Sequence, residues 1–180
     1  MTASDPRPLI GEPVSLDLLN TRWNEDGVRR DLLTDTEGLA IWLAANGLGD
    51  RFRADAATLR NTLAARDALA GLVDRPGDPA ATARVDAVLD HGRIRATLTP
   101  EGPGEEAEFE EAAWGPGWTA ARDYLDLLRA APDRIRACAH EACILHFFDT
   151  SRNGTRRWCS MAICGNRAKA SRHYARTKDN

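Results

Sequence analysis

Four cysteines lie near the C-terminal end of the sequence, at Cys138, Cys143, Cys159 and Cys164. They form two close pairs separated by a short segment, and no cysteine precedes Cys138. Zinc binds four thiolates at the corners of a tetrahedron, with Zn–S distances of about 2.3 Å. Because four protein ligands leave no open position for a substrate, the spacing predicts one structural zinc ion.

Other uses of the same cysteines remain open from the sequence. They could form two disulfides, an iron–sulfur cluster or a set of buried thiols. The first residues lack a basic region followed by an apolar stretch, so we expect a cytoplasmic location, where thiols stay reduced. Ferredoxin-like clusters use tighter spacing. His140 and His146 could replace a ligand, although four thiols already complete the site.

Charge divides the chain into an acidic body and a basic tail. Residues 134–180 contain ten Lys and Arg and three acidic residues, giving +7, whereas the preceding residues contain 14 basic and 24 acidic residues, giving −10. Such asymmetry indicates a polyanionic partner for the tail, or a small module that stays soluble through its charge. Duplex DNA is the partner that we expect; RNA or a protein is the alternative.

A cationic stripe is predicted on the last helix. On a helical wheel Lys169, Arg172 and Arg176 share one face, where they could contact phosphates. Arg156 and Arg157, in the segment before the third cysteine, add to the same basic module. Arg167 falls on another side of the wheel, and we expect it to tie the helix to the preceding segment or to Asp149.

The elements around the cysteines should bring the two pairs together. We expect an antiparallel hairpin of residues 144–148 and 156–158, joined by a turn that contains Asn153-Gly154. The residues after Cys164 favour a helix, which would place the last thiolate at a helix N-terminus, where the dipole stabilises negative charge. Knuckle, hairpin and helix together suggest a treble-clef-like zinc module.

The remainder of the chain predicts a mostly helical domain with a small antiparallel hairpin, and therefore an α+β protein. The run 14–23 is too short for periodicity to decide between strand and helix. Thr34 and Glu37 have capping-box spacing, and Gly47 resembles a C-terminal cap. Further helices are expected over 55–73, from Asp78-Pro79, and from Pro116 to about 131. Between the last two helices we expect a hairpin, made of a half-buried strand over 94–98, a turn over 99–106 and a partner strand over 108–114. We place the domains at 1–132 and 133–180.

One charged residue lies on an apolar helical face. Arg66 falls within the stripe of Leu63, Ala70 and Val73, and an unpaired buried guanidinium is very costly. Asp17 is a candidate partner, alongside Asn20 and Thr21. These four residues form either a structural ion pair and its surroundings or a small polar pocket for an anionic effector.

Several stretches resemble a known family. The C-terminal FFDTSRN, RRWCSM and CGNRAKA are similar to the CGNR zinc finger, whose name is the motif Cys164-Gly165-Asn166-Arg167. The front part resembles the ABATE domain in LDLLNT at 16–21, Trp42-Leu43 and LRNTLAARDAL at 59–69. The resemblance implies a stress-responsive, DNA-binding transcriptional regulator, with the four cysteines as zinc ligands.

The sequence gives no indication of catalysis or of membrane insertion. His91 stands alone, and there is no Ser-His-Asp pattern or Gly-rich phosphate loop, so we do not expect an enzyme. No run of 18 apolar residues exists, so we expect no transmembrane helix.

Overall fold

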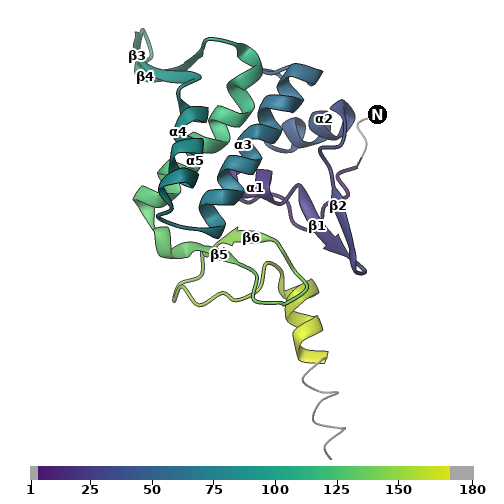
Figure 1. The fold of residues 1–180 in the computed structure, drawn as a ribbon. Helices are drawn as coiled ribbons and strands as arrows, with labels where there is room; N and C mark the ends of the chain where they lie inside the picture. Colours follow the sequence, from purple (N-terminus) through teal and green to yellow (C-terminus); the bar gives the residue numbers. More distant parts are fainter. Residues whose placement is uncertain (1–3, 171–180) are drawn as a thin grey trace, which may run out of the picture.

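The computed structural model describes residues 4–170, which form an α+β fold (Figure 1). A helical body carries three small antiparallel strand pairs, and the cysteine-containing part lies at one end of it. The helices of the body are α1 (Val14–Leu19), α2 (Thr36–Ala45), α3 (Ala56–Asp74), α4 (Pro79–Leu89) and α5 (Gly115–Ala130), and a short turn η1 (Ala112–Trp114) precedes α5. None of the described helices is long and apolar enough to cross a membrane.

The core of the body lies between α1, α2, α3 and α5. Trp42 is fully buried, as are Leu16 and Leu39, and Leu69 and Ala121 close the packing from α3 and α5. Full burial of one large apolar side chain contributes about 1.5–3 kcal/mol, so these residues determine how the helices pack. The short run 14–23, undecided from sequence, contains helix α1, and its apolar residues are buried because α1 contacts α5.

Aspartates begin three of the helices. Asp35, Asp55 and Asp78 each accept a hydrogen bond from the backbone N–H three residues later, at the start of α2, α3 and α4. The expected capping box of Thr34 and Glu37 is therefore wrong by one residue: Asp35 is the N-cap, because its carboxylate reaches Gly38 N at 2.9 Å. Gly47 (φ +67°) ends α2 as expected.

A hairpin that the sequence analysis missed follows α1. Strands β1 (Arg22–Glu25) and β2 (Val28–Asp31) are joined by Asp26-Gly27, both with positive φ. Asp-Gly between two short strands is a strong hairpin signal. The signal was present in the sequence, but the surrounding residues are too polar to give an alternating pattern.

The second hairpin exists, but its turn differs from the prediction. Strand β3 (Gly92–Thr99) pairs with β4 (Gly102–Phe109), so the chain reverses at Pro100-Glu101 and much of the segment predicted as a turn is strand. Its tip is not half-buried either: Leu98 is 84% exposed, because the hairpin projects beyond the helices (Figure 1). On α5, Trp118 and Ala121 are buried, whereas Leu128, towards the end of the helix, is 37% exposed.

The C-terminal part begins after α5 with the short turn η2 (Pro132–Arg134) and a strand pair. Strand β5 (Ile135–Ala137) pairs with β6 (His146–Phe148), and β6 packs against α1. A wide helical turn, η3 (Met161–Gly165), continues as a helix to residue 170. The expected pairing of 144–148 with 156–158 is wrong, because β6 pairs with the strand that precedes the first cysteine.

Candidate zinc centre and nucleic-acid interface

The β5–β6 pair positions the first two cysteines. Cys138 directly follows β5, and Cys143 lies in the turn that leads to β6. The Cys138 N–H donates to the Leu145 carbonyl at 2.9 Å, and the Cys143 N–H donates to His140 O at 2.8 Å. These bonds close a compact knuckle with both thiols on its inner side.

The second cysteine pair reaches the knuckle through a backbone crossing and a helical turn. The Ala139 N–H donates to Arg157 O at 2.8 Å, which brings the segment before Cys159 alongside the knuckle. The Cys159 N–H then donates to the Cys138 sulfur at 3.4 Å. Cys164 lies in η3, at the start of the last helix, as the sequence predicted.

The four sulfurs form a cluster of the size that zinc requires. All lie within 4.8 Å of one another, and Cys143–Cys159 and Cys159–Cys164 are 3.7 and 3.6 Å apart. A tetrahedron with Zn–S distances of about 2.3 Å has sulfur–sulfur edges of about 3.8 Å. Among the described residues, no histidine belongs to this group. The cysteines remain free thiols, unpaired by disulfides.

The electrostatics of the cluster also favour a bound cation. The hydrogen bond from Cys159, aided by the Leu145 N–H, lowers the pKa of Cys143 to about 5. The bond to Cys143, burial and the neighbouring thiolate charge raise the pKa of Cys159, and burial with the same charges raises that of Cys164 to about 12. Four thiolates this close repel one another, so a divalent cation is needed for all to ionise.

Arg156 is a structural residue of this centre, contrary to its predicted role in phosphate binding. Its guanidinium lies 4.2 Å from the centre of the Phe147 ring and donates to the carbonyls of Trp158 and Cys159. It also pairs with Glu12, from the N-terminal segment, at 3.4 Å. With these partners Arg156 is occupied in joining the cysteine-containing part to the body.

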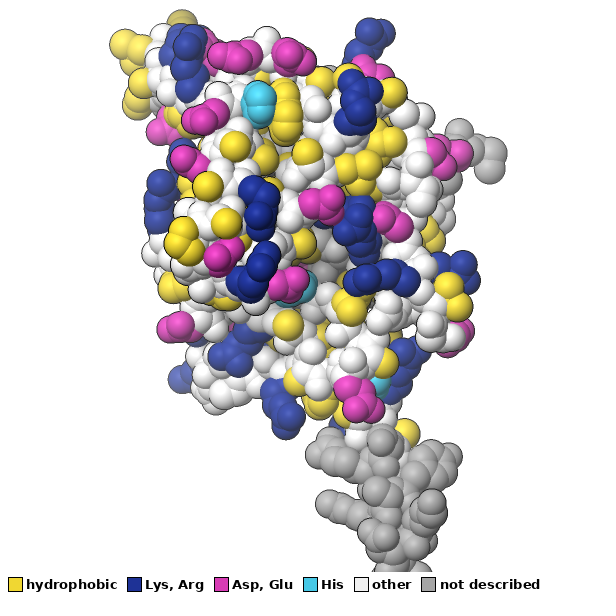
Figure 2. All heavy atoms as spheres, viewed as in Figure 1, with side chains coloured by type: hydrophobic (Ala, Val, Ile, Leu, Met, Phe, Trp, Pro, Cys, Tyr) yellow, Lys and Arg dark blue, Asp and Glu magenta, His cyan; other side chains and the backbone are white. Residues whose placement is uncertain are grey.

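The remaining predicted cations divide into two groups. Arg157 and Lys169 are exposed, whereas Arg172 and Arg176 lie outside the described residues. Arg167 is exposed as well, and its side chain bonds to no described residue, so the expected tie to the preceding segment or to Asp149 is wrong. Asp149 is fully buried, and its carboxylate accepts from the N–H groups of Ser151 and Arg156, both at 2.9 Å. Figure 2 shows Lys and Arg side chains over much of one face, including its lower part, where the cysteine-containing part lies.

Comparison with protein-family models accounts for both parts of the chain. The CGNR zinc finger matches residues 134–177. The ABATE model, described as “Putative stress-induced transcription regulator”, matches residues 12–131, more than half of the chain. The chain belongs to the ABATE family. No curated protein matches it. The four-cysteine cluster is accordingly the zinc site of a CGNR finger, and the sulfur geometry fits one zinc ion.

In the ABATE domain, Arg66 has a partner other than the predicted one. The guanidinium forms two bonds to the Asp31 carboxylate, at 2.7 and 2.8 Å, and a third to Thr21 Oγ1 at 2.8 Å. Arg66 is 1% exposed. The expectation of a buried ion pair on this face is correct, but Asp31, on the overlooked β2, is the partner in place of Asp17.

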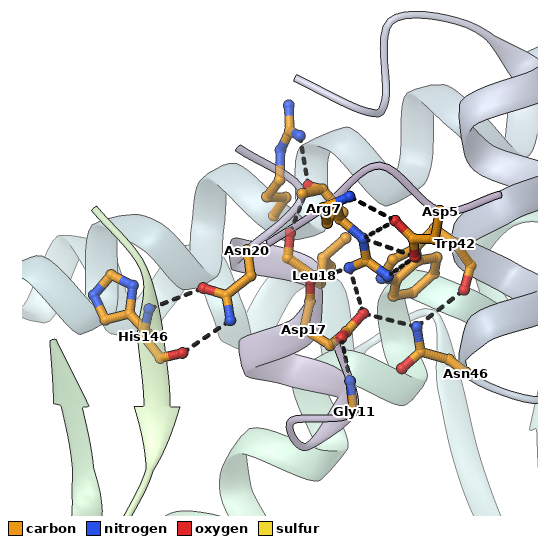
Figure 3. Close-up of polar contacts among 11 residues, drawn as sticks. Asp5, Arg7, Gly11, Asp17, Leu18, Asn20, Trp42, Asn46 and His146 are labelled. Carbon is orange, nitrogen blue, oxygen red and sulfur yellow. Dashed lines mark hydrogen bonds and ion pairs between the residues drawn. The ribbon is translucent and has the colours of Figure 1, made fainter. Parts of the chain in front are cut away.

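Asp17 belongs to a separate buried cluster (Figure 3). Its carboxylate accepts from Arg7 at 2.6 Å, from Asn46 at 2.9 Å and from the Gly11 N–H at 3.2 Å. Asp5 binds the other side of the Arg7 guanidinium. Sequence reasoning missed Arg7 and Asp5 because they lie in an irregular Pro-rich segment where no periodicity indicates burial.

Asn20 connects the ABATE domain to the finger. Its amide donates to His146 O and accepts from the His146 N–H, both at 2.8 Å (Figure 3). Glu12 accepts from the Phe148 N–H at 2.9 Å on the same strand. The four residues of the predicted effector pocket, Asp17, Asn20, Thr21 and Arg66, therefore bind three different sets of protein partners and do not form one pocket.

Proposed function

We propose that the CGNR finger binds duplex DNA through phosphate contacts and that the protein regulates transcription. The observation that carries the proposal is a set of exposed cations without acidic partners. Among the described residues, none forms an ion pair with Arg152, Arg157, Arg167 or Lys169, and all four side chains are exposed. Within residues 134–170, Glu141 is the one exposed acid.

The zinc centre gives these cations a fixed position. Arg157 lies next to the backbone crossing at Ala139, and its guanidinium is 5.2 Å from the centre of the Trp158 ring. Arg167 and Lys169 follow Cys164 on the last helix, which the metal anchors at its start. A rigid cationic surface of this kind binds phosphates without reading bases.

The test is the salt dependence of binding to duplex DNA by the full zinc-loaded chain. If four cations contact phosphates, log K should fall against log salt with a slope of about −3.6. Replacing Arg157, Arg167 and Lys169 by Ala should weaken binding to all sequences and reduce the slope by about 2.7. Zinc content should not change, because none of the three is a ligand.

A matched control removes the same charge elsewhere. The triple substitution Arg29→Ala, Arg53→Ala and Arg60→Ala, on exposed positions of the ABATE domain, should leave the slope unchanged. An equal loss in both triple variants would show that only net charge matters. Binding confined to RNA or to a protein would replace the proposal by the interaction-module alternative. We also propose a binding role, without catalysis, for the ABATE domain.

A further inference from the structure

A groove lies where the ABATE domain meets the finger. Two cavities of about 300 and 620 Å³ adjoin there, and both have Pro76, Tyr124 and Leu128 in their walls. The first lies between α4 and α5; the second continues to β5 and β6, which Figure 1 shows beneath the body. Volumes of this size accommodate small organic ligands.

The first cavity offers an apolar surface. Leu72, Val85, Leu89 and Leu125 line it, together with the Tyr124 side chain. Leu72 and Val85 belong to the buried core, so this wall is held in place by packing. An apolar chain of a ligand would bury carbon against carbon here, at about 25 cal/mol per Å².

Two polar groups in the groove have no partner among the described residues. Tyr124 is 4% exposed, and its hydroxyl forms no hydrogen bond with any of them. The Nδ1 of His146, which lines the second cavity, is buried and also without a partner. In Figure 3 the His146 ring points away from the Asn20 amide that binds its backbone. Buried polar atoms are normally hydrogen-bonded, so the buried Nδ1 of His146 indicates a missing partner, and the Tyr124 hydroxyl is available to the same ligand.

The charged residues in the walls of the groove indicate the charge of that partner. Asp74, Asp86 and Asp133 line the two cavities with exposed carboxylates, and none of them pairs with a described residue. Among the described residues that line the cavities, Arg136 is the one Lys or Arg. Its guanidinium lies 3.8 Å from the Asp149 carboxylate and donates to Asp133 O. Burial lowers the pKa of His146, and the negative charge of Asp74 opposes this shift.

We propose that this groove binds a small organic amine. The apolar chain lies between α4 and α5, and the ammonium group donates to the carboxylates of Asp74 and Asp133 beside Tyr124 and His146. Because Val73 and Tyr124 come from the ABATE domain, and Ile135 and His146 from the finger, the amine binds the docked arrangement of the two domains. Such a ligand stabilises the arrangement that it binds.

The test uses phenylbutylamine and the uncharged phenylbutanol with the full zinc-loaded chain, by titration calorimetry. The amine should saturate one site and bind at least about fivefold more tightly than the alcohol, as expected for ion pairs at partly exposed carboxylates. The double variant Asp74→Asn, Asp133→Asn should reduce amine affinity to that of the alcohol. Tyr124→Phe should reduce it less, and Glu105→Gln, on the distant β3–β4 hairpin, should not affect it.

A second variant tests the position without changing charge. Leu128→Trp should fill the groove where the cavities meet and abolish binding of both probes, with zinc content and melting temperature maintained. Equal affinity for amine and alcohol, absence of binding, or the same loss in Glu105→Gln would overturn the proposal. No DNA is present in these titrations, so the result is independent of the proposed DNA binding.

Discussion

The ABATE domain and the CGNR finger are stabilised in different ways. The ABATE domain buries Leu and Trp side chains from several helices around one core. In the described part of the finger, Leu145 and Phe147 are the only buried apolar side chains besides three of its cysteines. A module this small cannot bury enough apolar surface to offset its chain entropy. The comparison shows that the zinc ion replaces a core in the finger, whereas the ABATE domain folds through apolar packing.

Removing one zinc ligand should therefore give the largest difference in stability between the two domains. Cys159→Ser should abolish stoichiometric zinc binding and unfold the finger, because apparent binding free energies of structural zinc are about 10–16 kcal/mol. The ABATE domain should retain its helices and a cooperative melting transition. Metal analysis and circular dichroism measure both effects. Ser160→Ala is the matched control and should retain one zinc per chain. Wild-type protein without zinc, or with iron, would contradict this account.

Breaking the buried ion pair should affect the other domain. Arg66→Ala leaves Asp31 without its main partner and should destabilise the ABATE domain by about 3–5 kcal/mol. Chemical denaturation followed by helix content gives this value, and zinc content should stay at one per chain. Arg60→Ala, exposed on the same helix, should cost less than about 0.5 kcal/mol. Similar losses in the two variants would mean that the Arg66–Asp31 pair contributes no stability.

Lowering the pH should destabilise the two domains at different pH values, with smaller effects than the substitutions above. Burial raises the pKa of Asp31, but hydrogen bonds from Arg66 and Arg22 outweigh it, so the net shift is downward. The pair therefore contributes stability above the unfolded pKa of about 3.9 and loses it as pH falls through the lower folded value. The finger should release zinc at higher pH, because protons compete for its thiolates.

Zinc release and helix content should consequently follow two separate acid transitions. Asp31→Asn removes the titrating group, so it should lower the stability of the ABATE domain at neutral pH. It should flatten the acid transition in helix content and leave the zinc-release transition unchanged. A single transition common to both signals, or a shift of zinc release in this variant, would show that the domains do not respond independently.

The sequence predicted the parts in which chemistry or periodicity is local. The cysteine spacing identified the metal ligands, and Asp78-Pro79 and Gly47 marked helix ends, because each rule involves neighbouring residues. Arg66 was recognised as buried and charged from its place on a helical stripe. Its partner was not, because Asp31 lies on a short polar strand whose only signal was Asp26-Gly27.

The missed features depend on tertiary contacts. Arg156 and Arg157 are adjacent and identical in type, yet Phe147 and Glu12 engage one while the other remains exposed. The amine groove joins residues from α3, α4, α5, β5 and β6, so no sequence spacing could indicate it. The outward position of Leu98 likewise follows from where the helices end, which alternation along a strand cannot reveal.

The contacts of Asn20 and Glu12 with β6 have a consequence for self-association. One side of β6 pairs with β5, and its other side would present free N–H and C=O groups to any passing strand. Asn20 occupies both backbone groups of His146, and Glu12 accepts from Phe148, so side chains take the place of a third strand. The β6 edge of this small sheet is thereby closed against edge-to-edge pairing with another molecule.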